Sequence, residues 1–156
     1  MVAAGLAVAL GVVAAAPASA ASGFTGFVGQ THLGYDAELS ATGQADGTGT
    51  GSFAYAPELG GQTVTITCTD FTKYVSTHTN NPPPNGYPKT ILNASNCFGA
   101  DTRYFVHIEA IDRVGIGKKI EDSLCIVVKL FPGSQHPDPL IKDCGAPQDG
   151  DVVINQ

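Results

Sequence analysis

The sequence predicts an all-β domain, an antiparallel β-sandwich of Ig-like or jelly-roll-like type held by two disulfides. Three observations predict this class. No apolar set recurs at the spacing of an amphipathic helix over a useful length. Glycine and proline are frequent, with 19 and 10 residues, and β-branched residues are common, which favours short strands separated by turns. Four cysteines follow an N-terminal segment with the features of an export signal.

The first twenty residues predict export from the cell. Residues 3–16 are all small or apolar, and residues 17–20 (PASA) end in an Ala-x-Ala cleavage signal. The run is shorter than the ~20 residues that a membrane-spanning helix needs, although only Met1 and Val2 precede it, without the usual Lys or Arg. We expect residues 1–20 to be a secretory signal peptide. Residues 21–156 then form one domain that is secreted, with no membrane attachment after cleavage.

The cysteines are expected to form two disulfides, because export places them in an oxidising compartment. Cys68, Cys97, Cys125 and Cys144 allow three connectivities. We favour sequential pairing, in which each bridge closes a loop of roughly 20–30 residues and stabilises the fold by about 3–4 kcal/mol. No two cysteines have the C-x-x-C spacing of a zinc site, and a catalytic thiolate would need an unpaired cysteine.

The first predicted strands precede Pro57. Residues 33–45 alternate loosely and indicate a strand or hairpin arm. The glycine-rich residues 43–51 then predict a turn. Residues 52–56 predict a short strand with Phe53 and Tyr55 on one face.

The cleanest strand signal is residues 62–69. Val64, Ile66 and Cys68 alternate there with threonines, which is typical of a half-buried antiparallel strand. Residues 71–75 extend this pairing. Residues 80–87 (NNPPPNGY) follow, and their three prolines predict an exposed, rigid loop.

The C-terminal half predicts two paired strands and a closing one. Residues 103–111 alternate, whereas residues 123–130 are nearly all apolar and predict an interior strand covered on both faces. Residues 112–122 read as their hairpin loop, residues 131–149 as an irregular connection with a Pro-rich start, and residues 151–154 as the last strand. In the strand at residues 103–111, one set of side chains is expected to point inward: Tyr104, Val106, Ile108 and Ala110. The outward set is Arg103, His107 and Glu109.

Charge and motif content exclude several functional classes. The net charge of −6 disfavours nucleic acids and anionic membranes as partners, because phosphate binding needs a basic surface. No nucleophile elbow and no nucleophile–base–orienter set is present, and the four histidines are scattered. His107 is placed to neighbour Glu109. We therefore expect no catalytic residues, no cofactor and no metal.

A loose calcium site is the alternative reading of the acidic residues around the 112–122 loop. Asp112, Glu121 and Asp122 flank this loop, and carboxylates near glycine-rich loops suit calcium. We favour solvated loop charges instead, because cations lie beside them: Arg113, Lys118 and Lys119.

The C-terminal third resembles a known family. Residues 112–118 (DRVGIGK) and 122–128 (DSLCIVV) look like a loop-and-strand pattern, and residues 145–154 (GAPQDGDVVI) resemble a closing hairpin. Both patterns are similar to those of post-COAP-type small β-domains of exported proteins from high-GC Gram-positive bacteria. Residues 118–121 look inserted, and the four cysteines depart from the pattern. The resemblance implies an extracellular bacterial β-domain without assigned catalytic activity.

These features together predict a secreted non-enzymatic module with a structural, adhesive or binding role. Its partner would be the cell wall, a polysaccharide or a secreted protein, bound by loops at one end of the sandwich. The aromatic candidates are Tyr74, Tyr87 and Phe98. The candidate loop residues are Pro82, Pro83, Pro84, Tyr87, Arg113, Lys118 and Lys119.

Two alternatives stay open at this point. A secreted protease inhibitor would present the Pro-rich segment 81–88 as a pre-ordered loop, which lowers the entropy cost of binding. A carrier of apolar small molecules would need a cleft between the sheets.

Overall fold

The computed structural model describes residues 23–80, 86–113, 121–131 and 138–156. The predicted signal peptide, residues 1–20, lies outside these ranges. The described residues form twelve strands and no helix. The strands are β1 (Phe24–Gln30), β2 (Asp36–Gly43), β3 (Gly49–Tyr55), β4 (Glu58–Leu59), β5 (Gln62–Thr63), β6 (Ile66–Phe71), β7 (Lys73–His78), β8 (Pro88–Gly99), β9 (Thr102–Ile111), β10 (Ser123–Leu130), β11 (Ile141–Gly145) and β12 (Asp151–Asn155).

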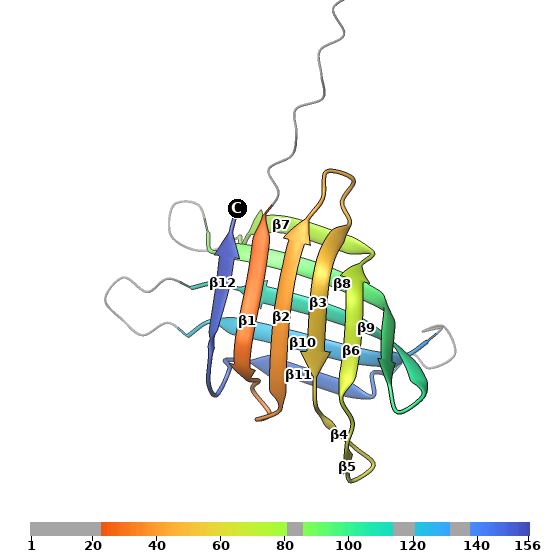
Figure 1. The fold of residues 1–156 in the computed structure, drawn as a ribbon. Coiled ribbons are helices and arrows are strands. Elements are labelled where there is room, and N and C mark those ends of the chain that lie inside the picture. The colour runs from red at the N-terminus through yellow and green to blue at the C-terminus, as the bar shows by residue number, and fades with distance from the viewer. Residues whose placement is uncertain (1–22, 81–85, 114–120, 132–137) are drawn as a thin grey trace, which may run out of the picture.

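Ten of these strands belong to one antiparallel sheet that folds over on itself. Its order is β11-β10-β9-β8-β6-β3-β2-β1-β12, and β7 pairs with β8 beside this path. Strands β12, β1, β2, β3 and β6 make a front layer, and β7 to β11 make a back layer that crosses it at a steep angle (Figure 1). The predicted class, an antiparallel β-sandwich with two disulfides, is confirmed, and its two layers belong to a single sheet.

The layers are joined at a corner where β6 pairs with β8. This ladder is short, with Thr67 opposite Phe98 and Cys68 opposite Cys97. The Cys68–Cys97 disulfide, with an S–S distance of 2.02 Å, lies in this ladder. A covalent link therefore holds the sheet where few backbone hydrogen bonds do so.

The second disulfide joins Cys125 of β10 to Cys144 of β11, which are also opposite each other in register. It fastens β11, an end strand of the sheet. The sequential pairing expected from the sequence is confirmed. Both bridges lie between paired strands.

The core lies between the layers and is built from the inward positions of both. The predicted inward sets of residues 52–56 and 103–111 are buried, and each fully buried large apolar side chain stabilises the fold by about 1.5–3 kcal/mol. The largest fully buried apolar side chains include Phe53, Tyr55, Phe71, Ile66, Leu92, Ile108 and Ile126.

Three strand predictions need correction. Strand β10 is buried on one face only, since Leu124, Ile126 and Val128 are buried while Cys125 and Val127 are partly exposed. The 62–69 strand is interrupted between β5 and β6, where the backbone N–H of Val64 donates to the carbonyl of Pro57 at 2.9 Å. The 71–75 extension also fails. The chain leaves β6 at Phe71, and β7 pairs with β8 in the back layer.

Four strands were not predicted at all: β1, β8, β11 and the two-residue β4. Strand β8 is the longest of the described strands, with 12 residues. Strand β11 lies inside the segment expected to be an irregular connection between residues 131 and 149.

Candidate functional site

The predicted loop residues are only partly within the described structure. Pro82, Pro83, Pro84, Lys118 and Lys119 lie outside it, so the inhibitor alternative stays a prediction. The two remaining candidates, Tyr87 and Arg113, lie at the ends of loops and make backbone hydrogen bonds there.

Tyr87 closes the β7–β8 connection by exchanging hydrogen bonds with Thr79. The Tyr87 N–H donates to Thr79 Oγ1 at 2.9 Å, and the Thr79 N–H donates to the Tyr87 carbonyl at 2.9 Å. Arg113 closes the β9–β10 connection, because its N–H donates to Asp122 Oδ1 at 2.7 Å. The N–H of Asp112 donates to the carbonyl of Pro88 at 3.1 Å, so the described ends of the two loops are neighbours.

Two carboxylates at the ends of the β9–β10 connection bind the edge strand β12. Asp122 Oδ2 accepts from the N–H of Val152 at 2.9 Å, and Asp112 Oδ2 accepts from the N–H of Ile154 at 3.1 Å. Strand β12 pairs only with β1 in the sheet order, so these donors are on its open side. We call Asp112 and Asp122 the edge clamp, because they tie the back layer to the free edge of the front layer.

The edge clamp crowds negative charge. Burial, together with the nearby charge of Asp122, raises the pKa of Asp112 against the lowering effect of its hydrogen bond from Ile154. The pKa of Asp151 is raised first by its hydrogen bond with Asp122, then by burial and by the charges of both clamp residues. The residues proposed for a calcium site thus include two that accept backbone N–H groups. Across the described ranges, no group of three or more His, Cys, Asp or Glu side chains is arranged to hold a metal ion.

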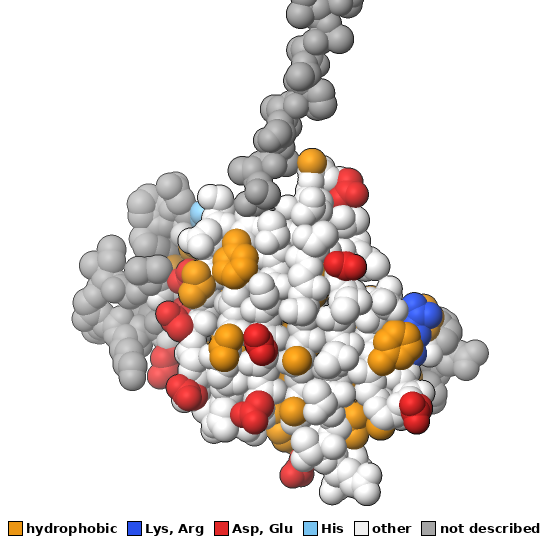
Figure 2. Space-filling view, viewed as in Figure 1, with side chains coloured by type: hydrophobic (Ala, Val, Ile, Leu, Met, Phe, Trp, Pro, Cys, Tyr) orange, Lys and Arg blue, Asp and Glu red, His pale blue; other side chains and the backbone are white. Residues whose placement is uncertain are grey.

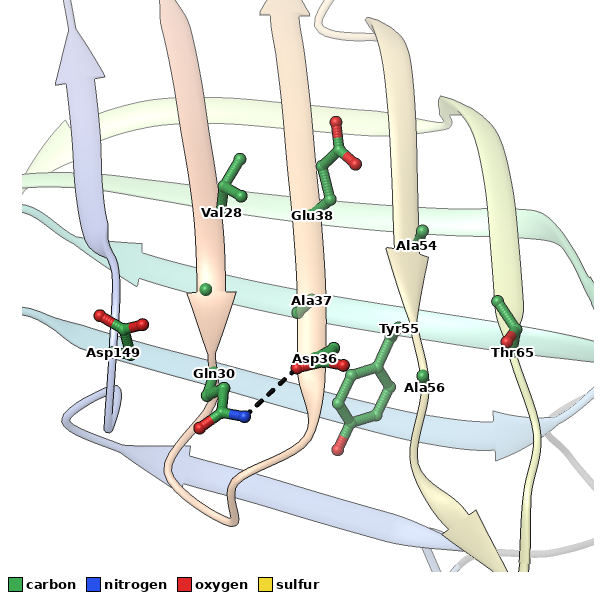
Figure 3. A pocket seen from close by; sticks show the side chains of 11 residues that line it. Val28, Gln30, Asp36, Ala37, Glu38, Ala54, Tyr55, Ala56, Thr65 and Asp149 are labelled. Atoms are coloured by element: carbon green, nitrogen blue, oxygen red, sulfur yellow. Dashed lines mark hydrogen bonds between the residues drawn. The ribbon is translucent and has the colours of Figure 1, made fainter.

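The other candidate site is a groove on the outer face of the front layer, with a volume of about 550 Å³. We call it the front groove (Figure 3). Strands β1, β2 and β3 and the segments before β6 and β12 supply its lining: Val28, Gly29, Gln30, Asp36, Ala37, Glu38, Ala54, Tyr55, Ala56, Thr65 and Asp149.

The floor of the front groove is apolar and open because its side chains are small. Ala54 and Ala56 leave space between the larger side chains, and Val28 is 67% exposed. Gly29 has φ +156°, and a Cβ there would lie 2.3 Å from the carbonyl oxygen of Asp149. Only glycine allows this close approach of β1 to the segment before β12.

Tyr55 fixes the base of the groove to the back layer. Its hydroxyl donates to Oδ2 of the buried Asp143 at 3.0 Å. Burial first, and then the charge of Asp143, raises the pKa of the Tyr55 phenol well above its ordinary value. The hydroxyl therefore stays protonated and keeps donating. The other Asp143 oxygen accepts from the N–H of Leu33 at 3.0 Å.

Carboxylates form the rim of the front groove (Figure 3). Gln30 Nε2 donates to Asp36 Oδ1 at 3.4 Å, and Asp149 Oδ1 accepts from the N–H of Gly150 at 2.8 Å. Glu38 is exposed, and no described residue pairs with its carboxylate. The strands of the front layer carry no Lys, Arg or His. An apolar floor beneath negative charge suits a cationic group on an alkyl stem.

Sequence reasoning missed the front groove. Strand β1, which supplies Val28 and Gly29, was not predicted, and the lining is assembled from segments up to 121 positions apart, from Val28 to Asp149. The sequence did hold one sign of the groove. In residues 36–38 and 54–56, acidic or small side chains point outward and alternate with buried ones.

The remaining candidates divide between core and surface. Tyr74 is a core residue whose hydroxyl lies 3.1 Å from Thr25 Oγ1. Phe98 is 49% exposed, and the guanidinium carbon of Arg103 lies 6.0 Å from its ring centre and 3.9 Å from that of Phe131. The expected proximity of His107 and Glu109 is confirmed, with Nε2 3.6 Å from Oε1.

None of the described residues forms a helix long and apolar enough to cross a membrane. No protein-family model matches the chain, and no curated protein or solved structure matches it either.

Proposed function

We propose that this protein is a secreted, non-enzymatic β-sandwich module whose role is to bind a partner through the front groove. The observation that carries the proposal is Glu38, an exposed carboxylate with no ion-pair partner among the described residues, beside the apolar floor made by Val28 and Ala54. Such a site offers electrostatic attraction and apolar contact, which are the elements of recognition.

The groove is held by a stiff frame, which favours binding. The Cys68–Cys97 disulfide fixes the corner next to β3 and β6, and the edge clamp holds β12. A pre-formed surface loses less entropy when a partner binds. The two disulfides also fit an oxidising environment outside the cytoplasm.

The chemistry of the groove selects among the expected partners. A lysine side chain or an amino-bearing polymer would place its alkyl stem on Ala54 and Ala56 and its ammonium near Asp36 and Glu38. Anionic polysaccharides and nucleic acids would be repelled from this face. We therefore favour a secreted protein or a cell-wall component that presents amines.

The test is binding of a short fluorescent peptide with two lysines separated by alanines, followed by anisotropy at physiological salt. We expect Asp36→Asn/Glu38→Gln to weaken binding at least about tenfold, which is 1.4 kcal/mol. The matched control, Glu58→Gln/Asp138→Asn, removes two exposed carboxylates outside the groove and should bind as wild type does. Equal loss in both variants would mean that net charge, and not the groove, attracts the peptide.

Secretion has its own test. Intact mass or N-terminal sequencing of protein from the culture medium should place the first residue at Ala21. A chain that keeps Met1 would contradict cleavage after Ala20.

A further inference from the structure

We propose that the front groove receives the outer face of the back layer of a second copy, so that copies of this chain associate front to back. This inference rests on the proposed function and names the partner of the same site.

Among the described residues, the cations belong to the back layer. All eight Lys and Arg residues fall between residues 73 and 142. Five of them lie on its strands, Lys73, Lys89, Arg103, Lys129 and Lys142, and Arg113 follows β9. The front layer carries Asp36, Glu38, Asp70 and Asp151 on its strands. In Figure 2, which views the front layer, blue gathers at the right-hand margin and the face is mostly white, red and orange.

The outer face of the back layer carries more basic than acidic side chains. Lys142, Val127, His107, Asn93 and Lys73 stand opposite one another across β11, β10, β9, β8 and β7. Lys73 and Lys142 are exposed at the two ends of this row. Glu109 is the outward carboxylate on these five strands, and Lys89 Nζ binds it at 2.7 Å.

The front face complements this surface in charge and in shape. Asp151, Val28, Glu38, Ala54 and Thr67 form a corresponding row across β12, β1, β2, β3 and β6. Its side chains are small apart from the carboxylates, so a second sheet face can approach closely. Val28 and Val153, 67% and 41% exposed, provide apolar contact for partly buried Val127 and its neighbours.

The two surfaces that meet in such a contact are different, and this determines how copies assemble. Because the front face of one copy meets the back face of the next, the contact is heterologous and leaves both outer faces of a pair free. Association therefore continues with concentration instead of stopping at a dimer. The shared net charge of −6 opposes it at long range, so the contact depends on the facing charges.

The experiment is sedimentation velocity of the purified protein over a concentration series. Wild type should show a rising sedimentation coefficient. Asp36→Lys/Glu38→Lys makes the centre of the front face basic, like the back face. Lys73→Glu/Lys142→Glu makes the two ends of the back row acidic, like the front face, so each variant alone should stay monomeric. An equimolar mixture should associate, with a sedimentation coefficient that rises with concentration, because the front of each variant then meets an oppositely charged back on the other. Near-ultraviolet circular dichroism checks that both variants are folded.

The matched control is Glu58→Lys/Asp138→Lys, which changes the net charge as much as the front variant does but lies outside both rows. It should associate like wild type. Monomeric wild type at every concentration, association of either reversed variant alone, or no complex in the mixture would each overturn the inference. If wild type is monomeric yet binds the lysine peptide through Glu38, the proposed function stands and the second copy is not the partner.

Discussion

Asp122 accepts a hydrogen bond from the backbone N–H of Val152 at 2.9 Å, across 30 residues of sequence. Its other oxygen accepts from the N–H of Arg113 at 2.7 Å. One carboxylate thus closes the β9–β10 connection and covers a donor on the open side of β12. Exposed edge donors invite pairing with other chains, and a carboxylate that occupies them prevents it.

Removing this carboxylate should destabilise the protein measurably. Asp122→Ala leaves the N–H groups of Arg113 and Val152 without an acceptor, and both are partly buried. We expect a loss of about 1–3 kcal/mol in the free energy of unfolding. Urea titration measures it, with Asp138→Ala as the exposed control. Equal stability of the two variants would show that water replaces the carboxylate without cost.

Replacing Asp151 should raise the free energy of unfolding, whereas replacing Asp122 lowers it. Its pKa in the folded protein is raised above the ordinary value of 3.8 by Asp122 and by burial. A raised carboxyl pKa means that the charged form is disfavoured by folding, so the penalty is present above the folded pKa and disappears below the unfolded one. Asp151→Asn should therefore be more stable than wild type at pH 7. The difference should shrink as the pH falls through the raised pKa towards 3.8.

Urea titrations of both proteins at several pH values measure this. A gain that is constant with pH would contradict the electrostatic cause. It would indicate that Asn at this position improves the backbone hydrogen bonding instead.

The sequence predicted most strands whose outward side is polar and whose inward side is apolar. Strand β9 is the clearest case, because buried Tyr104, Val106, Ile108 and Ala110 alternate with outward positions, of which Arg103, His107 and Glu109 are charged or polar. Strand β8 was not predicted, because its inward positions include Thr90 and Ala94, which contribute little to an apolar alternation. Strand β11 was not predicted, because one of its inward residues is Asp143, and an aspartate is typical of a loop. Its hydrogen-bond partner, Tyr55, lies 88 positions away in the sequence.

The candidate site was harder to predict than the fold. A groove depends on which strands lie side by side, and strand order cannot be read from alternation. The pairing of β12 with β1, at opposite ends of the chain, brings Asp149 beside Gly29. The edge clamp has the same origin, since Asp112 was recognised as a loop carboxylate but its acceptor role depends on Ile154.

The two disulfides should contribute unequally to the stability of the fold. Chain-entropy arguments give about 3–4 kcal/mol for bridges that span 29 and 19 residues. Cys68→Ala/Cys97→Ala should cost more than Cys125→Ala/Cys144→Ala, because the first bridge fixes the two-pair corner between layers. The second bridge reinforces a ladder of five pairs. Thermal unfolding of both variants compares them, and a larger loss for the second pair would contradict the role given to the corner.

Gly29 links fold stability to the front groove. In Gly29→Ala the new Cβ would lie 2.3 Å from the carbonyl oxygen of Asp149, so β1 and the segment before β12 must separate. Gly47→Ala is the matched control, because Gly47 has φ +82° and no atom within 4 Å of the new Cβ. The control should lose only about 1–2 kcal/mol from its left-handed backbone, and Gly29→Ala should lose more. Because the separation also displaces Asp149 from the rim, Gly29→Ala should weaken binding of the lysine peptide while Gly47→Ala does not. Unchanged peptide affinity in a destabilised Gly29→Ala protein would show that Asp149 is not part of the binding site.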